Sequence, residues 1–443
     1  MELKHINELE KATKKGQAEL LRLGFALLFI IAVMLYATQQ GVSGLNGVML
    51  AIAAVIGAYM AMNIGANDVA NNVGPAVGSK ALTLTGALFI AAIFEAAGAI
   101  IAGGAVVGTI RNGIIDPAQI PNADTFVWLM MAALLAAALW LNVATYVGAP
   151  VSTTHAIVGA VLGSGVAASG FDIVDWGTMG QIAASWVISP VLGGIFAAAF
   201  LYMVKRTITY QPDMVAAARR AVPWLIAFMG WTFGTYIILK GLNRVWKVGF
   251  LNASLIGLGI AIVAYLVAKW RLDRQTSLVS SKESVNKLFT IPLIFAAALL
   301  SFAHGSNDVA NAVGPLAAIV DVYTSATHMI TKEAPIPMWV MMVGALGISI
   351  GLALFGPKVI RTVGSEITEL DQMRAYCIAM AATITVIVAS QMGLPVSSPH
   401  IAVGGVFGVG FLREYLKKNY SRMLADIKMH HPEGDQAAID LFM

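Results

Sequence analysis

Twelve apolar segments, most of them long enough to cross a lipid bilayer, follow one another along this chain of 443 residues. A bilayer requires about 20 apolar residues per helix, and inside it each backbone polar group has to be hydrogen-bonded within the protein. Charged residues make up only 12% of the chain, roughly half their share in soluble domains. The sequence therefore predicts an all-α membrane protein of about 11–12 transmembrane helices and excludes a soluble globular protein. The predicted spans are 20–38, 47–64, 82–108, 126–148, 152–170, 178–204, 221–240, 248–268, 288–304, 338–356, 375–393 and 399–412, the last of which is too short to cross alone in a straight helix.

The basic residues between these segments indicate how the chain lies in the membrane, because Lys and Arg favour the cytoplasmic side. With the N-terminus inside, 23 of the 28 basic residues fall on the cytoplasmic side and 5 on the other. This bias accounts for the net charge of +4 without nucleic acid as a partner. We therefore predict a multi-pass protein of the cell membrane, embedded in lipid, whose N-terminus and C-terminal tail are both cytoplasmic.

Two motifs occur twice in the same order, which predicts that the protein consists of two repeats. Residues 65–75 read GANDVANNVGP and residues 305–315 read GSNDVANAVGP, with nine of eleven positions identical. Residues 150–160 read PVSTTHAIVGA and residues 395–405 read PVSSPHIAVGG, with six of eleven positions identical. Seven predicted spans separate the two copies of each motif, so the repeats are predicted to be inverted. Inverted repeats are typical of secondary transporters, whose substrate site lies near the membrane midplane between the repeats.

The duplication also divides the chain into parts. Between the repeats lies an insertion with two spans and basic loops that has no obvious copy. The first repeat has another span after PVSTTH, whereas no apolar run follows PVSSPH, so we expect a last span to be missing after the tail. The predicted parts are a cytoplasmic amphipathic segment (1–19), the N-terminal repeat (47–204), the insertion (205–287), the C-terminal repeat (288–412) and the polar tail (413–443).

Three carboxylates lie within or beside the predicted spans, at Asp68, Glu95 and Asp308. A charge in the membrane costs about 2.5–3.5 kcal/mol even on the mildest scale, so such residues usually serve function. Gly and Pro at the ends of each NDVAN motif permit broken helices, whose free carbonyl groups can bind a cation. Carboxylate and amide oxygens suit a small hard cation, and the alternative is that these residues only cap helices. The predicted cation-binding residues are Asn67, Asp68, Asn71, Glu95, Asn307, Asp308 and Asn311.

The PVS motifs place hydroxyl groups at the start of a predicted helix. A helix N-terminus has free N–H groups and the positive end of the helix dipole, and both favour phosphate-like anions. Helix capping is the simpler alternative and is compatible with anion binding. The spacing of Ser152 and His155 also raises the option of an intramembrane serine hydrolase, but no third catalytic partner is near in sequence, so we do not expect an enzyme. The predicted anion-binding hydroxyls belong to Ser152, Thr153, Thr154, Ser397 and Ser398.

Charge balance connects the two kinds of motif. The spans contain almost no Lys or Arg, so an anion beside Asp68, Glu95 and Asp308 would be repelled unless a cation or proton neutralised the carboxylates. This predicts cation-coupled anion transport and disfavours a passive anion channel. A partly protonated phosphate can donate a hydrogen bond to a carboxylate and sulfate cannot, which favours phosphate.

On these residues the chain resembles the inorganic phosphate transporter (PiT) family. The paired NDVAN and PVS motifs carry the resemblance, together with IFEAAGAIIAGG, TIRNGIID and ASWVISPVLGG in the first repeat. The resemblance implies symport of inorganic phosphate with Na⁺ or H⁺ by alternating access, with Na⁺ favoured, and with no cofactor or metal beyond the transported cation. It places Asp68 and Asp308 at the substrate as well as at the cation, and matches Glu95 to an acidic residue of sodium-coupled relatives.

The resemblance leaves several points open. Some relatives carry sulfate, so a proton-coupled phosphate or sulfate permease remains the alternative. Pro399 stands where the family usually has Thr, which preserves a helix start but removes one hydroxyl. A homodimer is one option for the oligomeric state, which the sequence does not determine.

Overall fold

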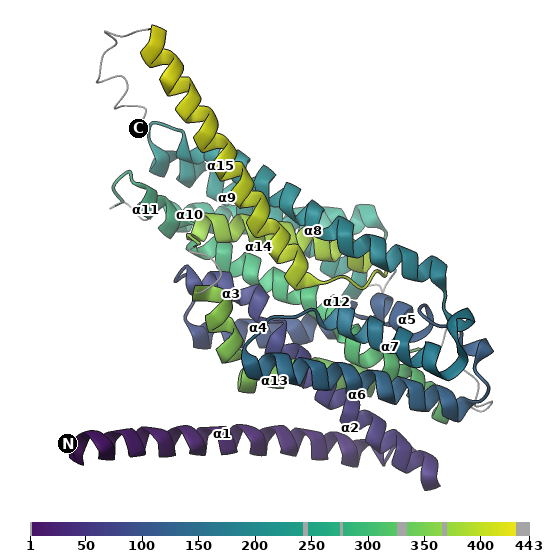
Figure 1. Cartoon of the computed structure of the whole chain (residues 1–443). Coiled ribbons are helices and arrows are strands. Elements are labelled where there is room, and N and C mark those ends of the chain that lie inside the picture. The colour runs from purple at the N-terminus through teal and green to yellow at the C-terminus, as the bar shows by residue number, and fades with distance from the viewer. Residues whose placement is uncertain (1, 242–246, 275–277, 326–334, 366–369, 431–443) are drawn as a thin grey trace.

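The computed structural model describes residues 2–241, 247–274, 278–325, 335–365 and 370–430. Within these ranges the regular structure consists of helices and one isolated β-bridge between Ile115 and Val174. Most helices pack into one bundle, and α1 lies along its side (Figure 1). The α-helices are α1 (Glu2–Ala37), α2 (Gly44–Asn67), α3 (Ala70–Gly78), α4 (Leu84–Ala102), α5 (Gly104–Asn112), α6 (Ala123–Val147), α7 (Thr153–Ser169), α8 (Trp176–Val204), α9 (Met214–Gly241), α10 (Phe250–Asp273), α11 (Lys282–Leu288), α12 (Thr290–Thr324), α13 (Met338–Ser365), α14 (Gln372–Gln391) and α15 (Ser398–His430).

The prediction of a membrane protein is confirmed, because ten helical stretches within the described residues are long and apolar enough to cross a bilayer. Two predicted spans do not qualify by themselves. The segment 152–170 forms α7, which has only 17 residues, and the segment 399–412 is the apolar first part of α15, which continues to His430. The part of the predicted tail beyond His430 lies outside the described residues.

Two predicted spans have different ends in the structure. The segment 82–108 was expected as one span, but Gly103 separates α4 from α5. The segment 288–304 was expected to end before the second NDVAN motif, but α12 continues through the motif to Thr324. The polar motif does not stop the helix because its side chains find partners in other helices, and Pro315 within α12 removes only one backbone donor.

The two NDVAN motifs also differ in backbone. The first motif breaks the helix, because α2 ends at Asn67 and α3 begins at Ala70. At this break the carbonyl oxygen of Asp68 accepts hydrogen bonds from the backbone N–H and the side-chain Nδ2 of Asn71, both at 3.0 Å. The second motif is continuous helix, so the expected helix break exists in one repeat only.

The helices of the two repeats pack on each other reciprocally. Helix α2 of the first repeat packs on α13 of the second, and α12 of the second packs on α4 of the first. Both contacts are close because a glycine faces a backbone carbonyl: Gly65 faces Ile348, and Gly305 faces Glu95. Such swapped pairs are what two repeats related by a two-fold axis produce.

A second pair of glycines repeats the pattern one turn further along. Gly351 faces the carbonyl of Met62 and Gly98 faces the carbonyl of Phe302. Corresponding residues are therefore 240 positions apart in α2 and α12, and 253 positions apart in α4 and α13. The counterpart of Glu95 is then Ile348.

We expect Gly305→Ala to destabilise the protein, because a Cβ there would overlap the carbonyl oxygen and Cα of Glu95. Overpacking of a close contact costs about 1–3 kcal/mol, and a helix backbone cannot move aside as a side-chain tip can. The melting temperature of the purified protein in detergent should fall. Gly259→Ala in α10 is the matched control, since a Cβ there meets nothing within 4 Å and should leave the melting temperature the same or raise it. Equal melting temperatures for the two variants would contradict the close contact.

Candidate functional site

The polar centre of the bundle lies where the two NDVAN motifs meet the start of α7. Asp68, at the helix break, and Asp308, in the middle of α12, are both fully buried. They approach the same hydroxyl group, because Oγ1 of Thr153 lies 2.5 Å from Oδ2 of Asp68 and 2.9 Å from Oδ2 of Asp308. Thr153 is the first residue of α7 and belongs to the first PVS motif. The structure therefore brings both NDVAN motifs to the first PVS motif.

The hydroxyl of Thr153 and the amide of Asn311 are the hydrogen-bond donors at these two carboxylates. The amide Nδ2 of Asn311 donates to Thr153 Oγ1 at 3.1 Å, to Thr154 Oγ1 at 3.2 Å and to Asp308 Oδ2 at 3.2 Å. A threonine hydroxyl has one hydrogen, so it can donate to Asp68 or to Asp308 but not to both. Two carboxylates this close and this buried repel each other unless a proton or a cation lies between them.

Several oxygen atoms around this point have no hydrogen-bond partner within the described part of the chain. They are Oδ1 of Asp68, Oδ1 of Asp308 and Oδ1 of Asn311, all buried, and the hydroxyl of Ser398 at the start of α15 is also buried and unpaired within the described residues. Buried polar atoms are nearly always paired, and leaving one unpaired costs about 1–3 kcal/mol. A group of unpaired carboxylate and amide oxygens therefore fits a small hard cation, which takes oxygen ligands.

His304 is a member of this centre that the sequence analysis did not assign to the site. Its ring nitrogen Nε2 lies 3.6 Å from Oδ2 of Asp308 and 3.9 Å from Oδ2 of Asp68. One atom from each of these three residues falls in a group whose members are all within 4.8 Å of one another. The signal was available, because His304 is a polar residue just before the motif and the first repeat has Ile64 at the same place.

Glu95 lies at the edge of the same centre and is fully buried. Its Oε2 is 2.7 Å from Nδ1 of His304, and its Oε1 accepts a hydrogen bond of 2.8 Å from Nδ2 of Asn72. The structure thus places Glu95 beside the two aspartates, with His304 between them.

Asn67 connects the first NDVAN motif to the loop before α7. Its Nδ2 donates to Thr145 Oγ1 and to the carbonyl of Ala149, and its Oδ1 accepts from the backbone N–H of Val151. Asn307 makes the same three contacts with the residues 245 positions on: Ser390, Leu394 and Val396. Both amides therefore hold the loop of a PVS motif against the adjacent aspartate.

The hydroxyls of the PVS motifs fall into different environments. Ser152 caps α7, because its Oγ accepts from the backbone N–H of His155, and Thr154 donates to the carbonyl of Val396 at 2.9 Å. Ser397 lies 2.6 Å from Nδ1 of His400. The hydroxyl of Ser152 is thus engaged as a helix cap. The ring of His155 packs against Trp186 and His400, and its Nε2 has no hydrogen-bond partner within the described residues.

Two swapped helix pairs surround buried carboxylates, and the described residues contain ten candidate membrane spans, so the protein is a polytopic membrane protein with a buried polar centre, as in membrane transporters. The sequence matches the phosphate transporter family over residues 64–430. The chain belongs to this family, which confirms the resemblance given by its motifs.

Individual relatives agree with the family. A Helicobacter pylori (strain J99) protein named "Putative phosphate permease" is 53% identical over 430 residues, which are 97% of this chain and 81% of that protein. A protein of the same description from Pyrococcus abyssi is 39% identical over 365 residues, covering 82% of this chain and 89% of the relative. The fold is similar to a solved structure titled "The sodium-dependent phosphate transporter", with a TM-score of 0.78, 35% identity, and coverage of 82% of this chain and 90% of that one.

Proposed function

We propose that the protein imports inorganic phosphate across the cell membrane by symport with a cation, in the first place Na⁺. The observation that carries the proposal is the pair of fully buried aspartates, one from each repeat, that share a single hydroxyl group and keep unpaired oxygen atoms. Such a centre is costly without a bound cation, so occupation by a cation is favoured. The sodium-dependent structural relative supports Na⁺ as that cation.

Asp68 and Asp308 are the proposed cation ligands, together with the free amide oxygen of Asn311. A bound cation would cancel the repulsion between the carboxylates and an incoming anion, which couples the binding of the two. The unpaired hydroxyl of Ser398 and the N-terminus of α7 then offer donors to phosphate. Asn67 and Asn307 hold the loops of the PVS motifs in place, since the nitrogen and the oxygen of each side-chain amide are already hydrogen-bonded to those loops.

The proposed transport cycle is alternating access about this centre. The glycine contacts join α2 to α13 and α12 to α4 so closely that each pair would move as a unit. The helices that begin at the PVS motifs, α7 and α15, join the two repeats through the bond from Thr154 to Val396. Rearrangement of this contact would open the centre to one side at a time. We also propose that the N-terminus lies in the cytoplasm, on the bias of the basic residues.

The test is uptake of radiolabelled phosphate into proteoliposomes that contain the purified protein. A Na⁺ gradient and a proton gradient are imposed in separate experiments, each with and without excess unlabelled sulfate. We expect concentrative uptake under the Na⁺ gradient that sulfate does not suppress. Uptake under the proton gradient alone would support the proton-coupled alternative, and suppression by sulfate would support a sulfate permease. Uptake that only equilibrates under either gradient would contradict symport and indicate a channel.

A further inference from the structure

Glu95 belongs to a polar cluster at the interface between the two repeats. The cluster consists of Glu95, His304 and Asn72, whose exposed fractions are 0%, 0% and 2%. Both oxygens of the carboxylate are already bonded, Oε2 to His304 at 2.7 Å and Oε1 to Asn72 at 2.8 Å. A transported cation at Glu95 would have to compete with these two partners.

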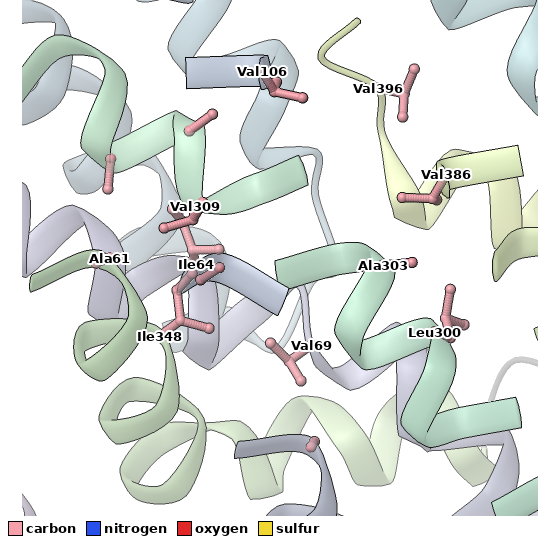
Figure 2. Close-up of a cluster of buried hydrophobic side chains, with 14 of the residues drawn as sticks. Ala61, Ile64, Val69, Val106, Leu300, Ala303, Val309, Ile348, Val386 and Val396 are labelled. Carbon is pink, nitrogen blue, oxygen red and sulfur yellow. The ribbon is translucent and has the colours of Figure 1, made fainter. Parts of the chain in front are cut away.

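The corresponding positions of the other repeat are apolar. The glycine contacts make Ile348 the counterpart of Glu95, and the 240-residue relation makes Ile64 the counterpart of His304. Figure 2 shows Ile64 and Ile348 side by side in the hydrophobic core, and both are fully buried. By the same relation Asn72 corresponds to Ala312. The interface between α4 and α12 therefore has a buried polar cluster where the related interface between α13 and α2 has ordinary packing, although each repeat has its aspartate.

His304 connects this cluster to the two aspartates. Its Nδ1 faces Glu95, while its Nε2 faces Asp308 at 3.6 Å and Asp68 at 3.9 Å and has no hydrogen-bond partner within the described residues. From α9, the hydroxyl of Tyr236 lies 3.5 Å from that of Ser306. The imidazole thus faces carboxylates from the helix break after α2, from α4 and from α12.

We propose that His304 holds the Glu95 carboxylate away from the transported cation and so sets how many cations accompany each phosphate. Paired with Glu95, it removes that carboxylate from cation binding, so the transported cation binds only to the aspartates. This inference rests on the proposed function and deepens it, and it makes His304 a specificity-determining residue for the cation.

The pairing predicts opposite effects for the two single variants. His304→Gln removes the ring that occupies Oε2 of Glu95, so an additional cation should bind and the dependence of uptake on cation concentration should become steeper. Glu95→Gln frees the imidazole to interact with Asp68 and Asp308, where it competes with the cation. The cation concentration for half-maximal uptake should then rise by about tenfold or more, a coupling within the usual range between sites. The double variant Glu95→Gln/His304→Gln lacks both the carboxylate and the ring and should return the steepness and the half-maximal cation concentration toward those of the unmodified protein.

The experiment measures initial phosphate uptake in proteoliposomes against the concentration of the driving cation, identified first with the unmodified protein. Ile64→Val/Ile348→Val, at the apolar counterpart of the pair, is the matched control and should leave the steepness unchanged. Melting temperatures show that each variant is folded. A double variant that is no closer to the unmodified protein than the single variants, or single variants with unchanged cation dependence, would overturn the pairing. Absence of concentrative uptake by the unmodified protein would instead overturn the proposed function itself.

Discussion

Replacing either Asp68 or Asp308 with asparagine should reduce gradient-driven phosphate uptake by about 30-fold or more. Each carboxylate is fully buried and belongs to the proposed cation site. Removing one member of a buried charged group typically costs about 2–5 kcal/mol in binding, and each 1.4 kcal/mol corresponds to about tenfold. Because one aspartate comes from each repeat, neither can replace the other. The measurement is initial uptake under the gradient that drives the unmodified protein.

The thermal stability of the two asparagine variants should not fall with their uptake. Asparagine keeps the size of the side chain and removes the repulsion between two carboxylates, so the melting temperature in cation-free buffer should stay the same or rise. Asp172→Asn, an exposed position in the short helix at Phe171–Ile173, is the control and should keep normal uptake. Loss of uptake together with a lower melting temperature would point to a structural role for the aspartates, and normal uptake in either variant would contradict the shared cation site.

The fold could be predicted from sequence as far as composition and local pattern decide it. Long apolar runs fix the membrane class, and most predicted spans lie within helices of the structure. The ends of the helices were predicted less well. The span predicted to stop at His304, for example, belongs to α12, which continues to Thr324. Local sequence shows a polar stretch there, whereas the continuous helix depends on partners such as Thr153, which is more than a hundred residues away in the chain.

Residues of the polar centre were singled out from the sequence where duplication provided a signal. Asp68, Asp308 and Asn311 lie close together in the structure because the motifs are repeated and the repeats pack on one another, and their role in cation binding stays a prediction. His304 and Asn72 were not assigned, because each occurs in one repeat only and a single polar residue near a span has many ordinary explanations. Sequence alone also cannot match Glu95 to Ile348, since the relation between α4 and α13 becomes clear only from which glycine contacts which carbonyl.

The hydroxyl of Thr153 is expected to matter more than any other hydroxyl in the site. It contacts both aspartates and accepts a hydrogen bond from Asn311, so it holds the centre together. Thr153→Val keeps the shape and removes the hydroxyl, which leaves buried charged oxygens without a donor. A hydrogen bond to a charged group contributes about 1.5–3 kcal/mol, so cation-dependent phosphate binding should weaken by about 10- to 100-fold.

The neighbouring threonine provides the comparison that separates this role from general packing. Thr154 has the same side chain, is equally buried, and bonds to the carbonyl of Val396 and to Asn311 but to no carboxylate. A hydrogen bond between neutral groups contributes about 0.5–1.5 kcal/mol, so Thr154→Val should weaken binding by less than about tenfold. Thr153→Ser should restore binding, because it returns the hydroxyl at the cost of one methyl group. Calorimetric titration of the purified protein with phosphate, in the presence of the driving cation, measures all three. Equal losses for the two valine variants would show that the aspartates do not depend on Thr153, and the shared hydroxyl would then be a consequence of packing.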